Sequence, residues 1–506
     1  MYGRKYETLI KNVFDHYIPY IEMECVEEAK LIDPNDKKVI GFHYGETHFA
    51  AAMIIYGYES SDRTLIQKGI AVLSGFMKNI NEYNQEPAYH WDFNNFALCV
   101  LYEYLKKHNQ NLNLQKELKI FVLNQKDSNN PTINWIPMRI FVNSCKYEWT
   151  NERKYKDIID KLKKIIAKAQ YQDGYFEDLL PKGTSFNFQY HIFTTAMLAF
   201  LNLRGIKIAD FDIAVQQVEN LIDPLGDANY LGRGINQIFA WGPLIYLLDV
   251  TESPAISRAL QYLESVAPDA VEKNNLMLND FLGEQKTWWW DYHYASVYHA
   301  HFALWLVLAL IEKRKTNWER SSLAISDSGV HILKKGGYFV CTFDGRKHYL
   351  AERGKQVANI CHKEHGYVFK GAFGPYPGKF GNLYSSPVTI LHNYFGPISK
   401  KVSKFGSLSI KPIFPENITV GLENGKLLIR FSLKKTYKNL MFNLPLYGLQ
   451  SEVKIVSDRK SNIDLKRVGA IDGPYGRVNI YQCDCVDAKT IDVLIGGDKN
   501  EISLYK

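Results

Sequence analysis

The stretch that decides the fold spans residues 173–201 and reads DGYFEDLLPKGTSFNFQYHIFTTAMLAFL. A glycine turn and a loop containing Lys, Gly, Thr and Ser come first, and apolar residues then recur at helical spacing from Ile192 to Leu201. Tyr190 and His191 therefore stand at the entrance of a predicted helix. Taken alone, such a pair is more often explained by packing and capping than by chemistry.

The chain repeats this arrangement, a polar and aromatic cluster just ahead of an apolar helical run. Six such clusters, 43 to 59 residues apart, are centred on His43, His90, Asn134, Tyr190, Arg233 and Tyr292. A repeat of that length holds two helices and two loops. Six repeats predict a closed ring of helical hairpins, an (α/α)6 toroid, complete or incomplete.

The helices of the predicted ring are of two kinds. Each helix after a cluster is apolar almost all round, which is typical of a buried inner helix, whereas helices such as residues 157–169 are amphipathic and belong outside. Because the inner helices of a toroid begin at the same rim, the six clusters are expected to converge on one face. An open superhelical array of helix pairs is the alternative architecture.

The apolar period changes after Lys315. Residues 316–327 are polar and predict a linker, and short alternating runs over residues 328–506 predict an antiparallel β-sandwich. The predicted organisation is therefore a toroid over residues 1–315, the linker, and a β-sheet domain. Residues 366–387 are rich in Gly and Pro and predict a long loop that reaches the helical rim.

Composition narrows the classes of partner. The hydrophobic share of 46% is typical of a globular protein. The net charge of +7 is spread along the chain without a basic block, so a nucleic-acid-binding tail is not indicated; the charge would suit an acidic substrate and equally no particular ligand. No run approaches the roughly 18 apolar residues of a membrane helix, and the N-terminus lacks a signal-peptide pattern. We expect no nucleic-acid or membrane partner and a cytoplasmic chain as it stands, with a secreted or phage-borne protein as the alternative. No oligomeric state is indicated.

No cofactor and no metal site are predicted. The seven cysteines are scattered without a CxxC pair and predict reduced thiols. His43 and His48 are interpreted as packing residues of the rim, and a zinc site joining Cys361 to His362 or His365 is a minor alternative. The need for a divalent cation stays open, since calcium assists some lyases, although no acidic loop here resembles a calcium site.

The predicted rim offers many amides, phenols and imidazoles but few carboxylates. This mixture suits β-elimination next to a uronic acid, in which hydrogen-bond donors neutralise the carboxylate and a base removes the adjacent proton. Asn134 is expected to hold the carboxylate, Tyr190 to take the proton and return one to the leaving oxygen, and Arg233 to stabilise both charges and lower the pKa of the phenol. Three histidines are candidates to share the base role: His191, His293 and His299.

The other rim residues are expected to bind the sugar chain by stacking and hydrogen bonding. They are His43, His90, Asn94, Trp135, Arg139, Gln189, Gln237, Trp290 and Tyr298. A glycoside hydrolase is the rival hypothesis, since hydrolysis commonly needs two carboxylates, and Asp92 with Asp178 or Asp291 would supply them. The third hypothesis is a glycan-binding protein that retains the aromatic rim without the chemistry.

A family resemblance rests on Asn134-Trp135, Asp173-Gly174 with Tyr190-His191, residues 290–305 and the all-β C-terminal half. Together they resemble the polysaccharide lyases built from an α/α toroid and antiparallel β-sheets, namely the heparinase II/III-like and alginate lyase group and, more distantly, chondroitin AC and hyaluronate lyases. The resemblance implies a carbon-oxygen lyase acting on an acidic polysaccharide, with Asn134 neutralising the uronate and Tyr190 as acid and often base.

One departure from that resemblance concerns histidine. The heparinase-like families carry a His-x-His segment in the first β-sheet, whereas the only such segment here, His299-Ala300-His301, lies in the helical half. Either His392 or the pair His362 and His365 would have to stand in for it.

Overall fold

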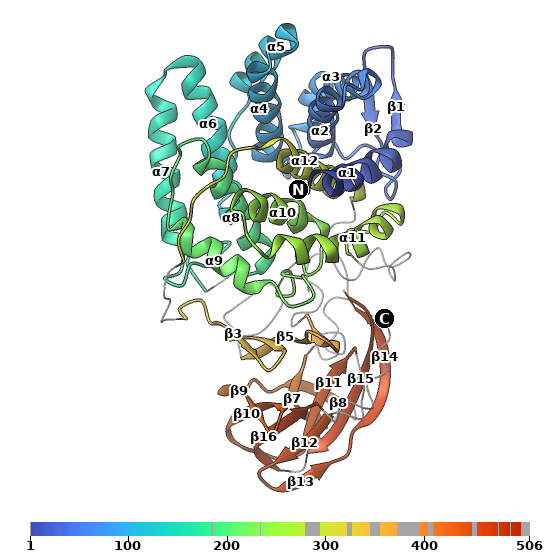
Figure 1. Cartoon of the computed structure of the whole chain (residues 1–506), viewed down its shortest axis with the longest axis vertical. Coiled ribbons are helices and arrows are strands. Elements are labelled where there is room, and N and C mark those ends of the chain that lie inside the picture. Colours follow the sequence, from blue (N-terminus) through green and yellow to red (C-terminus); the bar gives the residue numbers. More distant parts are fainter. Residues whose placement is uncertain are drawn as a thin grey trace.

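The computed structural model describes residues 2–183, 186–232, 234–278, 294–320, 326–344, 355–371, 394–402, 408–447, 453–473, 475–485 and 487–496. Helices occupy one end of the elongated molecule and strands the other (Figure 1). No helix within these ranges is long and apolar enough to cross a membrane.

Six helices form an inner ring in the described part of the chain. They are α2 (Gly45–Ser60), α4 (Trp91–Lys107), α6 (Ile136–Thr150), α8 (Phe188–Asn202), α10 (Trp241–Val250) and α12 (Ala295–Ile311). Most of their residues are buried, because apolar side chains leave them in every direction. Each helix packs on the next and α12 packs on α2, so the ring closes. The predicted toroid is confirmed, and the open array is wrong.

The outer helices are amphipathic and cover this ring. They are α1 (Gly3–Tyr17), α3 (Arg63–Tyr83), α5 (Leu112–Asn124), α7 (Arg153–Ala169), α9 (Phe211–Leu221) and α11 (Ile256–Glu272). The helix α7 shows the pattern clearly, since it buries only one stripe, Ile159, Leu162, Ile166 and Ala169. The N-terminal helix α1 lies against α11 and α12 and completes the outer layer. A short hairpin of β1 (Ile21–Met23) and β2 (Ala29–Leu31) follows it.

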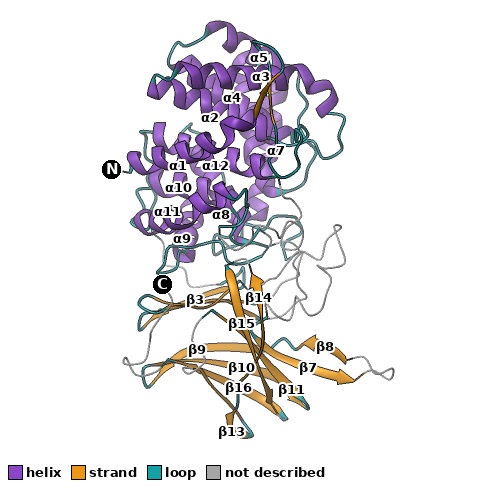
Figure 2. Ribbon diagram, turned by 90° about the vertical axis from the view of Figure 1, so that its right-hand side faces the viewer, coloured by secondary structure: helices purple, strands orange, loops and turns teal. Residues whose placement is uncertain are grey.

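The C-terminal half consists of antiparallel sheets, as predicted (Figure 2). A four-stranded sheet runs in chain order through β3 (Val330–Lys335), β4 (Tyr338–Phe343), β5 (Gln356–His362) and β6 (Gly366–Lys370). Two five-stranded sheets have the orders β13-β12-β16-β10-β9 and β14-β15-β11-β7-β8. Their strands are β7 (Gly396–Val402), β8 (Leu408–Pro412), β9 (Asn417–Glu423), β10 (Lys426–Tyr437), β11 (Leu440–Leu446), β12 (Val453–Ser457), β13 (Lys460–Ile463), β14 (Lys466–Gly473), β15 (Gly476–Cys485) and β16 (Ala488–Ile495).

The four-stranded sheet is a middle layer between the helices and the other two sheets. Side chains alternate across a strand, and both faces of β4 are covered: Phe339 and Cys341 join the helical core, whereas Val340 joins the core of the sandwich. The strand β6 occupies the start of the predicted loop over residues 366–387, so that prediction is wrong for residues 366–370. From residue 372 onward that stretch lies outside the described residues, as His392 does.

Buried polar contacts join the sheets to the loops that precede α8 and α10. The fully buried Lys370 of β6 is ion-paired with Asp227 and lies 3.7 Å from Asp223. Asn359 of β5 donates a hydrogen bond of 3.0 Å to Asp223, and Ser328 donates one of 2.7 Å to Asp173. The β-sheets are therefore docked on the end of the ring where these inner helices begin.

Candidate active site

The N-terminal ends of the inner helices surround a cavity of about 130 Å³. Its described lining comes from the starts of α2, α4, α8 and α12, from the turns ahead of α6 and α10, and from the loop after α7. The lining residues are Tyr44, His90, Phe93, Asn130, Thr132, Asn134, Trp135, Asp178, Gln189, Tyr190, Phe239 and Tyr298. Side chains up to 254 residues apart in the sequence thus meet at one rim, as the repeat predicts.

Tyr190 reaches the cavity because of the way α8 begins. The side chain of Asn187 caps the helix by accepting a 2.9 Å hydrogen bond from the Tyr190 backbone N–H. The backbone N–H of Phe188 donates to the Leu231 carbonyl at 3.1 Å, which ties the helix start to the loop ahead of α10. Tyr190 is partly exposed on this fixed first turn, and its ring meets Phe239 edge-on at 6.1 Å.

Asn134 and Asp178 form a buried pair in the wall. Asn134 belongs to the 3₁₀ turn Ile133–Trp135 ahead of α6, and its Nδ2 donates a 2.8 Å hydrogen bond to Asp178 Oδ1. The neighbouring backbone N–H of Ile133 donates to the Asp178 carbonyl, also at 2.8 Å. The Oδ1 of Asn134 has no hydrogen-bond partner within the described residues. The Asn134 amide is therefore held through its nitrogen, whereas its oxygen has no partner among the described residues.

Stacked rings form another wall. The His90 ring lies 4.0 Å from the ring of His43 behind it and 4.8 Å from Trp135. Its Nδ1 lies 3.3 Å from the Phe42 carbonyl, which favours a proton on that nitrogen. Burial lowers the pKa of His90 to about 4, so the imidazole is neutral near pH 7. His43 is almost completely buried and lies outside the cavity.

Gln189 supplies a second amide to the lining. Its Oε1 has no partner among the described residues, and the side chain is 2% exposed. Gly234 packs directly against it: a Cβ on Gly234 would lie 2.4 Å from the amide, and the φ of +76° also favours glycine. Arg233, the predicted cation, lies outside the described residues, but the glycine that follows it touches the residue next to Tyr190.

Two of the predicted histidines are turned away from the cavity. His191 is fully buried, and its Nδ1 accepts a 3.2 Å hydrogen bond from the Phe176 backbone N–H. His299 contacts the Tyr17 hydroxyl through Nδ1 at 2.6 Å and the Asn275 carbonyl through Nε2 at 3.0 Å. Burial lowers the pKa of both imidazoles to about 3. Neither ring lines the cavity, and the contacts of both fit a structural role.

Asn94 and Arg139 hold the rim together from behind. Asn94 donates to the carbonyls of His43 and His90, both at 3.0 Å, and accepts from the Thr47 hydroxyl at 2.8 Å. Arg139 forms a two-point ion pair with Asp92, through Nε at 3.2 Å and Nη2 at 2.7 Å. Neither side chain lines the cavity.

The remaining predicted residues divide into two groups. Trp135 and Tyr298 line the cavity, whereas Gln237 lies one turn before α10 and outside the lining. His293, Trp290 and Asp291 lie outside the described residues, as Arg233 does.

Sequence reasoning missed several lining residues: Tyr44, Phe93, Asn130, Thr132 and Phe239. Tyr44 directly precedes α2, so it belongs to a cluster that the repeat already marks. Asn130 and Thr132 come from a polar loop, in which the Asn130 side chain accepts from the Thr132 N–H at 2.9 Å. The signal for these two was a run of Asn, Pro and Thr immediately ahead of Asn134.

The described wall of the cavity has few charged side chains. Asp178 is the one carboxylate among the described lining residues, and neither Lys nor Arg is found among them. Asp92 is bound to Arg139, and burial raises its pKa to about 6 even though the guanidinium opposes that shift. The described wall is thus dominated by neutral hydrogen-bonding groups and aromatic faces.

Comparison with known proteins finds no family model and no curated protein that matches the chain. A heparan sulfate lyase HepC mutant from Pedobacter heparinus is similar in structure, with a TM-score of 0.48 and 10% identity over 97% of this chain and 83% of that one. A glycosyl hydrolase family 88 protein from Bacteroides vulgatus gives 0.40 and 12%, over 61% and 98%. The α-1,6-mannanase GH76A of Salegentibacter sp. HEL1_6 gives 0.38 and 11%, over 62% and 100%. These three proteins are carbohydrate-active enzymes of both lyase and hydrolase type.

Proposed function

We propose that the chain is a polysaccharide lyase that cleaves a uronic-acid-containing glycan by β-elimination. One observation carries the proposal: the Asn134 amide and the Tyr190 phenol, which come from consecutive repeats, line the same cavity. A carboxylate neutraliser and a proton carrier in one site are the minimum that this reaction needs.

Asn134 is the group that meets the substrate carboxylate. Its amide nitrogen has two N–H groups; one donates to Asp178, and the other would donate to the substrate carboxylate. The Gln189 amide, beside Tyr190, is a second donor. Hydrogen bonds to the carboxylate stabilise the negative charge that develops when the adjacent carbon loses its proton.

Tyr190 carries the proton in this proposal. As a phenolate it takes the proton from the carbon next to the carboxylate, and that C–H electron pair becomes a carbon-carbon double bond. The glycosidic C–O bond breaks at the neighbouring carbon, and the leaving oxygen receives the proton back from Tyr190. The phenolate needs a nearby cation, and Arg233 is the candidate because Gly232 and Gly234 permit close backbone approach.

Hydrolysis is the second candidate, and Asp178 is the observation in its favour. This carboxylate is 3% exposed, lines the cavity and is oriented by Asn134, as an acid catalyst would be. Its predicted partner Asp92 is neutralised by Arg139 and does not line the cavity. The described lining of the cavity therefore lacks the second carboxylate that hydrolysis commonly uses.

The test mixes purified protein with a panel of uronate polysaccharides and follows the ultraviolet absorbance of the unsaturated uronate product alongside new reducing ends. We expect both signals to rise together in the wild type and to disappear in Tyr190→Phe. Asp178→Asn, which retains an oxygen to accept from Asn134, should keep measurable elimination.

Reducing ends without the ultraviolet signal, lost in Asp178→Asn, would contradict the lyase proposal and establish the hydrolase. If a substrate binds but neither signal appears, the glycan-binding hypothesis takes its place.

A further inference from the structure

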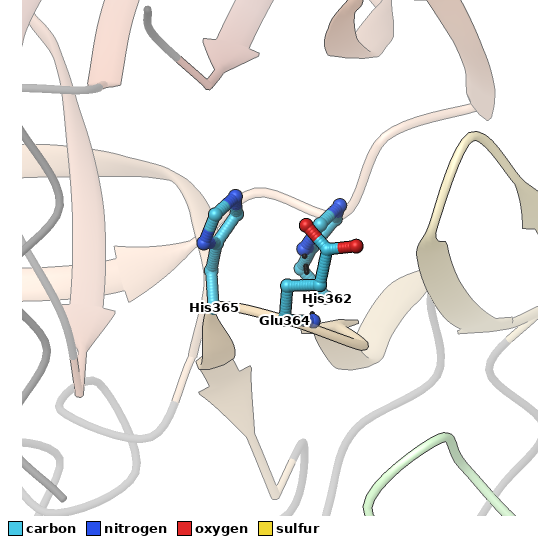
Figure 3. A group of neighbouring side chains, drawn as sticks. All are labelled: His362, Glu364 and His365. Carbon is cyan, nitrogen blue, oxygen red and sulfur yellow. Dashed lines mark hydrogen bonds between the residues drawn. The ribbon is translucent and has the colours of Figure 1, made fainter. Parts of the chain in front are cut away.

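Three metal-ligating side chains gather at the turn between β5 and β6. His362 ends β5, and Glu364 and His365 lie in the turn before β6; one ligand atom from each lies within 4.8 Å of the others. Figure 3 shows both imidazoles and the carboxylate rising from the same side of this turn. The two rings are stacked, with centroids 4.3 Å apart and planes 12° from parallel.

The surroundings of His362 fix its tautomer. Its Nε2 lies against the β3–β4 turn, where a Cβ on Gly337 would fall 2.5 Å away, and the Gly336 backbone is hydrogen-bonded to the ring. Its Nδ1 accepts a 3.2 Å hydrogen bond from the Glu364 backbone N–H, so this nitrogen carries the lone pair. A neutral ring with its proton on the far nitrogen and its lone pair on the near nitrogen is the usual state of a metal-binding histidine, and in this structure the lone pair is occupied by the Glu364 N–H.

The position of Glu364 also permits metal binding. Glu364 is exposed, and its carboxylate lies 3.6 Å from the ammonium of Lys363, which is exposed as well. Metal binding would replace two interactions by coordination: the contact between Glu364 and Lys363, and the 3.2 Å hydrogen bond from the Glu364 N–H to His362.

Cys361, the partner considered from the sequence, is excluded by strand geometry. Neighbouring residues of a strand point to opposite faces, and Cys361 is buried in the helical core whereas His362 packs on Tyr338. The donor set is therefore two imidazoles and one carboxylate, without a thiolate.

We infer that the β5–β6 turn binds a divalent transition-metal ion, of which Zn²⁺ is the representative, through His362, Glu364 and His365. Two nitrogen donors and one carboxylate suit such an ion better than Ca²⁺ or Mg²⁺, which prefer oxygen. Three protein donors at an exposed turn leave the last position of a tetrahedral site to water. The site is independent of the proposed elimination chemistry.

The test is titration calorimetry of the whole chain, treated with a chelator and then titrated with ZnCl₂, MgCl₂ or CaCl₂. We expect one Zn²⁺ per chain, no comparable heat with the other two ions, and a higher Tm with Zn²⁺ present. Glu364→Gln and His365→Asn should each weaken Zn²⁺ binding roughly tenfold or more. Because Glu364 is exposed and His365 is half-exposed, both variants should have the same Tm as the wild type when zinc is absent.

Lys363→Met is the matched control, because it changes the same turn without removing a donor. It should bind Zn²⁺ as tightly as the wild type or more tightly, since it removes a competing cation. His331→Asn serves as a second comparison, because His331 lies 3.0 Å from Asp344 and also offers a histidine–carboxylate pair. Binding that survives in the double variant Glu364→Gln/His365→Asn, or that is lost in His331→Asn, would overturn the assignment, as would the absence of saturable binding.

Discussion

The two ends of the helical ring differ in what their polar side chains bind. The end where the inner helices begin has the cavity of about 130 Å³ with Asn134 and Tyr190. The opposite end, where those helices finish, has a larger one of about 510 Å³. Three of the cations that line the larger cavity are each paired with a glutamate: Lys106 with Glu148 at 2.7 Å, Arg204 with Glu103 at 2.9 Å and Arg314 with Glu312 at 2.8 Å.

Helix polarity explains this difference. Cations are stabilised near the last carbonyls of a helix, and Arg204 donates to the Phe200 carbonyl at 3.1 Å while its guanidinium lies 3.5 Å over the Phe200 ring. At the beginning of the helices, by contrast, Asn134 Oδ1 and Gln189 Oε1 have no partner among the described residues. Unpartnered amide oxygens, rather than cavity volume, therefore distinguish the candidate active site; the larger cavity is lined by the Tyr246 hydroxyl, which likewise has no partner among the described residues.

The largest expected effect is on turnover. Tyr190→Phe removes the proposed proton carrier and should lower kcat by two to four orders of magnitude, roughly the contribution of general acid–base catalysis. Steady-state rates on the best uronate substrate measure this loss. Tyr102→Phe removes a phenol from the opposite cavity and should leave kcat unchanged; an equal loss in both variants would remove the distinction between the two ends.

The next effect is on stability and concerns the buried ion pair behind the cavity. Arg139→Met leaves Asp92 buried without its guanidinium and should lower the free energy of unfolding by about 3–5 kcal/mol. Urea denaturation measures the change. The double variant Arg139→Met/Asp92→Leu removes both charges and should recover part of the loss, whereas no recovery would show that packing, not charge, was lost.

A smaller effect concerns pH. Burial lowers the pKa of His299 to about 3, below the usual value of about 6.5. Between these values the unfolded chain binds the extra proton, so this stabilisation is complete above about pH 6.5 and declines as the pH falls toward 3. His299→Gln should make the loss of stability below pH 6.5 shallower by about 1.4 kcal/mol per pH unit.

Urea denaturation from pH 7 to pH 5 measures the two slopes. His108→Gln, at the exposed C-terminal end of α4, is the matched histidine substitution for comparison. Glu46 acts in the opposite direction, since burial raises its pKa to about 8, so only the difference between variant and wild type is diagnostic. Identical slopes in wild type and His299→Gln would contradict the assignment of His299 as a neutral buried group.

The smallest effect on stability is expected at the end of the ring where the inner helices finish. Lys106 and Glu148 are 52% and 62% exposed, so Lys106→Met should change the free energy of unfolding by less than about 1 kcal/mol. Thermal denaturation with Arg139→Met as the reference measures the contrast. A loss as large as that of Arg139→Met would mean that the far end contributes to stability as the near end does.

The sequence by itself determined the order and kind of the elements. All-round apolar runs identified the inner helices, and alternation placed a strand at residues 338–343, where β4 lies. The repeat of a polar cluster before each inner helix also predicted that Asn134 and Tyr190 would share one rim, because local patterns recur wherever the chain makes the same unit.

The tertiary structure alone decided that the ring closes and which member of each cluster faces the cavity. Successive helical residues point about 100° apart, so Tyr190 lines the cavity while His191, one position later, is buried against Phe176. Contacts between segments distant in the sequence likewise bound Arg139 to Asp92 and brought Asp178 to Asn134. A local pattern contains no information about where the centre of the ring lies, and that centre determines which side chains can reach a substrate.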